Sequence, residues 1–368
     1  MGAVDEDQRF MAAAIRLSRW NTGRTSTNPS VGCIIVRDGV IVGRAVTAPG
    51  GRPHAETQAL ADAGEAARGA TVYVTLEPCS HHGKTPPCSG ALVAAGVARV
   101  VVSVTDPDPR VSGRGLEMLR DAGIEVTTGV LEAEGRAALA GYLTRHIRKR
   151  PHVTLKLALS ADGMIGRLGE GQVAITGPVS RAQVHVLRAE MDAILVGINT
   201  ARADDPELTC RLPGLEDRSP VRVILDPRLE LPPTGKLGST AGKVPVVAVA
   251  EVAELYDDDD AAFAARRAAL DAAGVEIVGD DPKNLGGLLT GLASRGISSL
   301  LVEGGAATAR SFMAAGLVDR ILLFQGAVEI GPDGIESPLT KSDMPEQYHL
   351  VRTERFGEDI CDEYERGI

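Results

Sequence analysis

Residues 70–88 read "ATVYVTLEPCSHHGKTPPC". The second half of this stretch contains two cysteines, Cys79 and Cys88, with two histidines between them. The first seven residues of the stretch have the apolar, β-branched composition of a buried strand. A Pro-Cys pair follows at once, and eight residues separate Cys79 from Cys88. This arrangement is compatible with a disulfide, a redox switch, a zinc site or two cysteines brought together by chance. The rest of the chain must decide among them.

The composition of the chain restricts the classes of protein to which it can belong. The chain has 368 residues, 44% of them hydrophobic, and a net charge of -10, which favours two soluble domains over one. The acidic balance argues against binding to nucleic acid or to an anionic membrane. No apolar run is long enough to span a bilayer, and "MGAVDEDQRF" lacks the pattern of a signal peptide. We therefore expect a cytoplasmic protein, in which five cysteines do not indicate a disulfide framework.

The first half alternates between strand and helix patterns. "VGCIIVRDGVIVGRAV" (31–46) predicts a β-hairpin that turns at Asp38-Gly39. Helical patterns cover residues 6–19, 54–67, 89–97 and 113–123, and further strands are predicted at 70–76, 99–104 and 124–130. This order favours a three-layer α/β/α domain with a largely parallel sheet.

The second half alternates in the same way. Strands are predicted at 151–160, 192–197, 220–226, 245–250, 298–305 and 319–328, with helices at 178–190, 261–273, 284–294 and 307–315. We place the junction at the basic stretch "RHIRKRP" (145–151), so that one domain covers residues 1–147 and a second α/β domain covers 151–368. The acidic run at 257–260 is expected to be a solvated loop.

Pro-His-Ala-Glu at residues 53–56 provides a partner for the cysteines, because it begins a predicted helix. One imidazole, from His54, and two thiolates, from Cys79 and Cys88, are three zinc ligands, which leaves a fourth position for water, as in catalytic sites. Glu56 is close enough in sequence to shuttle a proton from that water to a leaving amine without binding the metal. The H-x-E…P-C pattern is the signature of zinc deaminases that act on bases. His81 and His82 are alternatives to Cys88 as the third ligand.

These motifs resemble one family in particular. "TNPSVGCIIV", "PHAE" and "VTLEPCSHHGKTPPC" are similar to the deaminase domain of the bifunctional riboflavin-biosynthesis deaminase/reductases, which also have eight residues between the cysteines. The resemblance implies a cytidine-deaminase-like fold, with zinc bound by His54, Cys79 and Cys88 and with Glu56 as the proton shuttle. It places Asn28 and Lys84 at the pyrimidine and Asp106 at the ribose, in a segment (105–115) that lines the ribose-phosphate end. Ser26-Thr27 stands where the family commonly has a histidine.

The second half resembles the reductase domain of the same family. The matching stretches are "LKLALSADGMIG", "AITG", "ILVGINTARADDPELTCR" and "VEGG", and they imply a dihydrofolate-reductase-like fold that binds NADPH. The resemblance implies a catalytic and cofactor-binding role for Asp204. Its other implied substrate contacts are Lys156, Gln172, Arg188, Leu208, Arg211 and Glu303, with the two arginines at the phosphate. Its other implied NADPH contacts are Ala158, Ala174, Thr200, Gly305, Ala306, Ala307, Thr308, Ala309, Arg310 and Ser311. The family often has Ser and Trp where this chain has Gln172 and Ala174.

The resemblance therefore implies an enzyme with two activities on one phosphorylated intermediate. The zinc hydrolase would deaminate 2,5-diamino-6-(5-phosphoribosylamino)pyrimidin-4(3H)-one. The oxidoreductase would then use NADPH to reduce the ribosyl group of 5-amino-6-(5-phosphoribosylamino)uracil to a ribityl chain. Its partners would be small molecules, together with further copies of the chain in a homo-oligomer.

Two alternatives remain. One is a deaminase of free cytidine or of a base in RNA, which the eight-residue gap and the acidic charge disfavour. The other is a structural zinc module joined to a nucleotide-sensing domain, which leaves Glu56 without a role.

Overall fold

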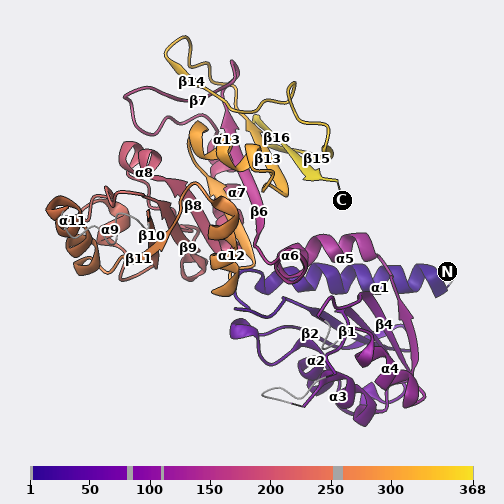
Figure 1. The fold of residues 1–368 in the computed structure, drawn as a ribbon. Coiled ribbons are helices and arrows are strands. Elements are labelled where there is room, and N and C mark those ends of the chain that lie inside the picture. The colour runs from indigo at the N-terminus through magenta and orange to yellow at the C-terminus, as the bar shows by residue number, and fades with distance from the viewer. Residues whose placement is uncertain (1–2, 81–85, 109–111, 252–259, 368) are drawn as a thin grey trace. The chain divides into compact units, whose positions relative to one another are not determined.

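The structure is a computed structural model, and it describes residues 3–80, 86–108, 112–251 and 260–367. The predicted ligand Lys84, the alternatives His81 and His82, and part of the acidic run at 257–260 lie outside these ranges. The chain divides into two compact units, Met1–Lys149 and Arg150–Ile368 (Figure 1).

The first unit is built on a five-stranded sheet in the order β2-β1-β3-β4-β5. Its strands are β1 (Gly32–Arg37), β2 (Val40–Val46), β3 (Thr71–Leu76), β4 (Arg99–Val104) and β5 (Glu125–Thr128). The predicted hairpin is present, and Asp38 and Gly39 both have positive φ, at 51° and 74°, as a tight hairpin turn between twisted strands requires. The sheet is mixed rather than largely parallel, because β1 runs antiparallel to both β2 and β3.

Helices cover both faces of this sheet. On one face, α1 (Ala3–Ser18) packs on β1 and β3 beside α5 (Glu132–Ala138), and its apolar stripe, which includes Phe10 and Met11, is buried. On the other face lie α2 (Ala55–Ala63), α3 (Cys88–Ala95) and α4 (Arg114–Asp121). The last helix, α6 (Ala140–Arg148), follows α5 directly. Short 3-10 turns are η1 (Arg19–Asn21), η2 (Pro49–Gly51) and η3 (Gly64–Ala67).

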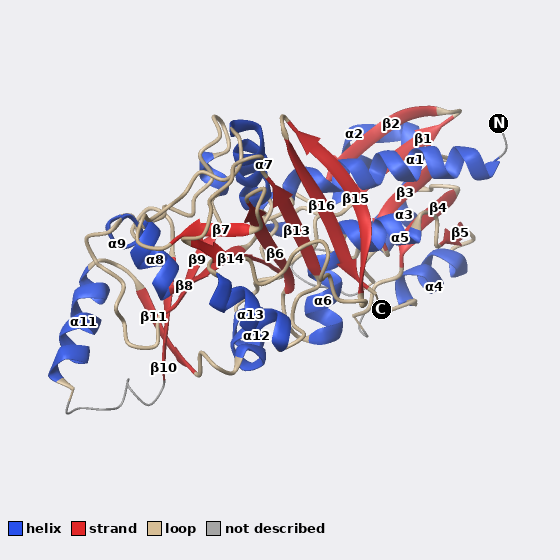
Figure 2. Ribbon diagram, turned by 90° about the horizontal axis from the view of Figure 1, so that it is seen from above, coloured by secondary structure: helices blue, strands red, loops and turns tan. Residues whose placement is uncertain are grey.

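The second unit has a nine-stranded sheet in the order β11-β10-β9-β8-β12-β6-β13-β16-β15 (Figure 2). The strands are β6 (His152–Leu159), β8 (Ala193–Gly197), β9 (Val221–Leu225), β10 (Val246–Glu251), β11 (Glu276–Asp280), β12 (Ser299–Glu303), β13 (Arg320–Gln325), β15 (Tyr348–Phe356) and β16 (Asp359–Arg366). The strands from β11 to β13 in this order pair in parallel, whereas β16 and β15 add an antiparallel edge. A separate ribbon pairs β7 (Met164–Arg167) with β14 (Gly334–Glu336).

Two hydrophobic layers hold the helices of the second unit on its sheet. Leu288, Leu289 and Leu292 of α12 (Leu285–Ser294), together with Phe312 of α13 (Ala306–Ala314), pack on one face. The other face carries α7 (Pro178–Ala189), α9 (Lys236–Ser239) and α11 (Ala261–Ala272). The remaining elements are α8 (Ile198–Asp204) and η4 (Glu216–Arg218). Among the described residues, no helix is both long and apolar enough to cross a membrane.

Candidate active sites

Three residues from separate elements meet at the first candidate site. His54 lies immediately before α2, Cys79 follows β3, and Cys88 is the first residue of α3. The His54 Nδ1 atom lies 3.7 Å from Cys79 Sγ and 3.4 Å from Cys88 Sγ. Their ligand atoms all lie within 4.8 Å of one another, and both cysteines are free thiols rather than a disulfide.

These distances fit one zinc ion. With Zn–S bonds of about 2.3 Å and Zn–N bonds of about 2.0–2.1 Å, tetrahedral ligation separates N from S by roughly 3.5 Å. The Cys88 backbone N–H donates to Cys79 Sγ at 3.3 Å, which favours a thiolate there. Hydrogen bonds from the Cys88 side chain and from His54 lower the pKa of the Cys79 thiol to about 4. The donor set is therefore suited to hold zinc with one position left open.

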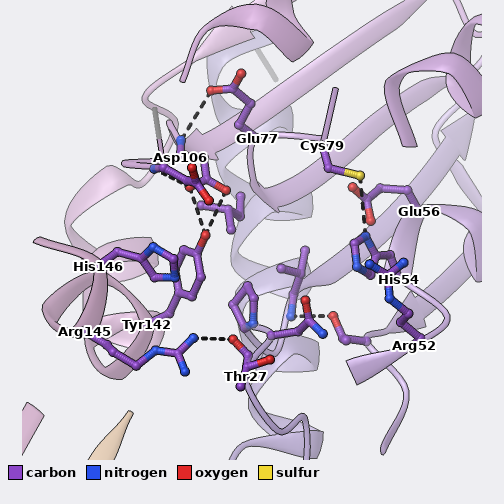
Figure 3. Close-up of a pocket in the computed structure, with 16 residues that line it drawn as sticks. Thr27, Arg52, His54, Glu56, Glu77, Cys79, Asp106, Tyr142, Arg145 and His146 are labelled. Atoms are coloured by element: carbon purple, nitrogen blue, oxygen red, sulfur yellow. Dashed lines mark hydrogen bonds between the residues drawn. The ribbon is translucent and has the colours of Figure 1, made fainter. Parts of the chain in front are cut away.

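Glu56 lies in the first turn of α2, two residues after His54, and it is only 4% exposed. Burial raises the pKa of its carboxyl to about 7. Its side chain lines the same pocket as His54 and Cys79 (Figure 3). The carboxyl is therefore beside the proposed metal and faces the space that a substrate would occupy.

The predicted pyrimidine contact Asn28 also lines this pocket. Its backbone is fixed by Thr25, whose hydroxyl donates to the Asn28 carbonyl at 2.7 Å and whose carbonyl accepts from the Asn28 N–H at 3.1 Å. Gly51 packs against it with φ at +86°, and a Cβ there would clash with the Asn28 amide and the Thr25 carbonyl. A glycine is thus required to leave room for Asn28.

Asp106, the predicted ribose contact, is 6% exposed and lines the pocket as well. Burial raises the pKa of its carboxyl to about 6. The Asp106 backbone is held by Glu77, whose carboxylate accepts from the N–H groups of Asp106, Gly113 and Gly115 at 3.3, 3.1 and 3.2 Å. The first unit therefore brings together six of the predicted residues: His54, Cys79, Glu56, Asn28 and Asp106 line the pocket, and Cys88 completes the metal cluster.

The sequence did not single out one wall of this pocket. Tyr142, Arg145 and His146 project from α6, on the side of the pocket opposite His54, Cys79 and Arg52 (Figure 3). Their i, i+3, i+4 spacing places them on one helix face, and this spacing was the available signal. The stretch assigned to the domain junction, 145–151, thus begins as the last turn of α6. Asp108, from the segment 105–115 that was expected to line the ribose-phosphate end, also lines the pocket. The other lining residues without a predicted role are Thr27, Pro29, Val31, Thr47, Arg52, Leu76 and Glu77.

A second cluster lies in the second unit, where the carboxyl end of β12 pairs with the middle of β6. Glu303 and Lys156 are register partners on these adjacent parallel strands. Arg188 reaches them from α7 and donates to both Glu303 carboxylate oxygens at 2.9 Å, and to the Thr209 carbonyl at 3.2 Å. Lys156 is partly buried, and burial lowers the pKa of its amine. Two of the predicted substrate ligands, Arg188 and Glu303, therefore bind each other directly.

The predicted cofactor residues meet at the next strand end. The Gly305 backbone N–H donates to the Thr200 hydroxyl of α8 at 2.9 Å. A Cβ on Gly197, at the end of β8, would lie 2.7 Å from the Thr308 hydroxyl, so α8 and α13 approach closely. Carboxyl ends of parallel strands are where open α/β sheets bind nucleotides. The remaining members of this segment, Ala306, Ala307, Ala309, Arg310 and Ser311, occupy the first two turns of α13.

The other predicted reductase residues lie outside these two groups of contacts. Ala158 lies on β6, opposite Phe324 of β13. Asp204 ends α8, where burial raises the pKa of its carboxyl. Leu208 is buried, and Arg211 is half-exposed and donates to Glu207 at 3.1 Å. Gln172 and Ala174 are exposed in the segment between β7 and α7.

Comparison with known proteins finds matches to two protein families, one in each half of the chain. Residues 4–104 match the family described as the cytidine and deoxycytidylate deaminase zinc-binding region, and residues 151–361 match the RibD C-terminal domain. The riboflavin biosynthesis protein RibD of Aquifex aeolicus is 39% identical over 96% of this chain and 97% of its own length. The Escherichia coli RibD is 36% identical over 97% of this chain and 98% of its own length.

Solved structures agree over the whole length. Acinetobacter baumannii RibD superimposes with a TM-score of 0.85 at 34% identity, over 99% of this chain and all of its own. A Thermotoga maritima diaminohydroxyphosphoribosylaminopyrimidine deaminase/5-amino-6-(5-phosphoribosylamino)uracil reductase gives 0.86 at 33% identity, with the same coverage. The chain therefore belongs to the RibD family of riboflavin biosynthesis, whose members join a zinc-dependent deaminase to an NADPH-dependent reductase in one polypeptide.

Proposed function

We propose that the two activities are divided between the two units, with deamination in residues 1–147 and reduction in residues 151–368. The observation that carries this assignment is the His54, Cys79 and Cys88 cluster beside the buried Glu56 carboxyl, in a pocket that also contains Asn28 and Asp106. The sequence H-x-E…P-C supports the same chemistry.

In the first unit the substrate is 2,5-diamino-6-(5-phosphoribosylamino)pyrimidin-4(3H)-one. Bound zinc supplies a water that is acidic enough to act as hydroxide near neutral pH. Glu56 takes a proton at its carboxylate and returns it to the exocyclic amine, so that a C–N bond breaks, a C–O bond forms and ammonia leaves. Asn28 orients the ring and Asp106 accepts from the ribose. Lys84, the remaining predicted contact, lies outside the described residues.

In the second unit 5-amino-6-(5-phosphoribosylamino)uracil is reduced to the ribityl compound. NADPH supplies the hydride, and we assign its binding to the segment around Thr200, Asp204 and Gly305–Ser311. Arg211 binds the phosphate, because a guanidinium offers two parallel donors to an anion. Glu303 keeps the Arg188 guanidinium in one orientation, which supports a role of that buried pair in shaping the substrate pocket.

The assignment also includes a cytoplasmic location and assembly of the chain into a homo-oligomer. Cell fractionation tests the location. Light scattering of the purified protein gives the mass of the assembly and so the number of chains in it.

Glu56→Gln tests the deaminase assignment. The amide keeps the shape of the side chain but cannot shuttle a proton, so deamination should fall by about 10²–10⁴-fold while zinc content stays at one per chain. Glu132→Gln is the control, because Glu132 lies on α5, outside the pocket, and pairs with Arg136 at 2.8 Å. Wild-type deamination by Glu56→Gln would remove this residue from the mechanism.

A further inference from the structure

The α6 wall of the deaminase pocket is separate from the zinc machinery. Matching to the deaminase zinc-binding region ends at residue 104, whereas α6 spans Ala140–Arg148. The metal cluster and Glu56 thus belong to the part shared with other zinc deaminases, and α6 adds a wall on the far side of the pocket (Figure 3). A wall outside the shared region is positioned to contact the part of the substrate that is not the reacting ring.

Tyr142 connects this wall to Asp106. Its phenol O–H lies 3.0 Å from Asp106 Oδ1 and 3.1 Å from Oδ2, and it donates to this carboxylate. The Asp106 Oδ1 atom also accepts from the Asp108 N–H at 2.9 Å. The Tyr142 ring is supported by His146, with ring centroids 4.3 Å apart. Carboxylate and phenol are therefore held side by side, and both residues line the pocket.

The same helix face is tied to the opposite loop. The Arg145 guanidinium donates to the Thr27 carbonyl, and Thr27 precedes Asn28. α6 thus contacts both the Asp106 loop and the Asn28 loop. This arrangement fixes the distance between the two groups that the proposed function assigns to the sugar and to the ring.

The bonding capacity of the pair suggests its ligand. A phenol has one hydrogen and two lone pairs, so Tyr142, having donated to Asp106, still accepts. The Asp106 Oδ2 atom accepts a further hydrogen bond as well. Two adjacent acceptors, from different side chains and held in one geometry, match the two donors of a vicinal diol.

From this arrangement we infer that Tyr142 and Asp106 together bind the two ring hydroxyls of the substrate's ribose, with Tyr142 both orienting the carboxylate and accepting from the sugar. The inference rests on the proposed deaminase function. It adds a specificity residue from α6, and it makes selection for a ribosylated pyrimidine a property of this pair rather than of the zinc site.

The test combines two enzymes with two substrates. Wild type and Tyr142→Phe are assayed on the phosphoribosyl substrate and on its 2,3-dideoxyribosyl counterpart, with KM and kcat measured separately. Tyr142→Phe should raise KM for the phosphoribosyl compound by about two- to tenfold, the size expected for one hydrogen bond between neutral groups, with kcat changed much less. The dideoxy compound should react equally with both enzymes.

Tyr73→Phe is the matched control. The Tyr73 phenol donates to Asp7 at 3.0 Å in the same unit, away from the pocket. The Tyr73→Phe substitution also removes a hydrogen bond from a phenol to a carboxylate, so KM and kcat of this variant should stay at the wild-type values.

Three outcomes distinguish the possibilities. An unchanged KM for Tyr142→Phe, or an equal loss on both substrates with zinc retained, overturns the inference. A wild type that deaminates neither compound overturns the proposed function, and this inference with it. A wild type that reacts faster with the ribosyl compound, combined with a Tyr142→Phe variant in which this preference is smaller, supports both.

Discussion

Arg188 and Glu303 form a two-point ion pair at the end of β12, with Nε–Oε1 and Nη2–Oε2 both at 2.9 Å. Their side chains are 12% and 11% exposed. Burial alone would raise the pKa of Glu303, but Arg188 and the neighbouring Lys156 outweigh it and hold that pKa at about 2. The carboxylate is thus the counter-charge for two partly buried cations, Arg188 and Lys156, and its removal would leave both without this compensation.

Glu303→Gln should therefore destabilise the second unit by about 3–5 kcal/mol near neutral pH, as expected when one partner of a buried pair is removed. Because the folded pKa lies below the ordinary value of 4.5, the stabilisation is complete above that pH and is lost as the pH falls towards 2. Denaturant unfolding near pH 7 and near pH 3 measures the difference, which should shrink at the lower pH. Glu230→Gln is the control, because Glu230 pairs with Arg202 at the surface. A Glu303→Gln variant as stable as wild type at both pH values would contradict this account.

Gly51→Ala should impair deamination through Asn28. Its new Cβ would clash with the Asn28 amide, whereas a Cβ on the neighbouring Gly50 would meet no atom within 4 Å. Both glycines have positive φ, at 86° and 78°, so both variants carry a backbone strain of about 1–2 kcal/mol. Comparing the KM for deamination of the two variants separates the effect of the clash from that of the strain. Gly51→Ala should raise KM, and Gly50→Ala should change it much less. Equal effects would show that strain alone is responsible.

Cys88→Ser should lose zinc, since a neutral hydroxyl is a poor replacement for a thiolate. Metal analysis of the purified variant measures this directly. Cys210→Ala, in the second unit, should keep one zinc per chain because Cys210 is outside the metal cluster. If Cys88→Ser retained full zinc, His81 or His82 would become the better candidate for the third ligand.

Arg211→Ala should impair reduction and leave deamination intact. The phosphate is remote from the carbon that receives hydride, so the loss should appear mainly in KM. Arg295→Ala provides the control, because Arg295 is a similarly exposed arginine of the same unit that pairs with Glu276, outside the residues assigned to substrate or cofactor. Both half-reactions are assayed in each variant, with the deaminated compound supplied directly for the second. Equal damage to both would mean that the chain is divided wrongly, and undamaged reduction would place the phosphate elsewhere.

Motifs in the sequence were sufficient for the zinc cluster and the hairpin. The H-x-E…P-C pattern and the second cysteine indicated a shared metal site for His54, Cys79 and Cys88 although 34 residues separate the first from the last, and Asp38-Gly39 has the composition of its turn. The C-terminal strands β15 and β16 escaped prediction because their composition is polar. β15 is an exposed edge strand, and β16 buries Asp359, Asp362 and Glu363. Hydrogen bonds from Ser180 and Thr353 and ion pairs from Lys341 and Arg320 satisfy these carboxylates.

Long-range pairing could not be predicted from one sequence. Arg188 and Glu303 were each expected at the substrate, yet their pairing across 115 residues depends on how β12 and α7 assemble. Tyr142 reaches Asp106 across 36 residues through the position of α6. The i, i+3, i+4 spacing of Tyr142, Arg145 and His146 indicated a helix face, but only the fold gives that face a pocket.

Mass spectrometry of the reaction products tests the central claim most directly. The zinc-loaded enzyme is incubated with 2,5-diamino-6-(5-phosphoribosylamino)pyrimidin-4(3H)-one, with and without NADPH. Without NADPH the account predicts a product in which one amine is replaced by oxygen, with the ribose intact. With NADPH it predicts the same deaminated compound carrying two additional hydrogens on the sugar, and an equal amount of oxidised cofactor. An unchanged substrate in both incubations, or reduction of the sugar without loss of the amine, would contradict it.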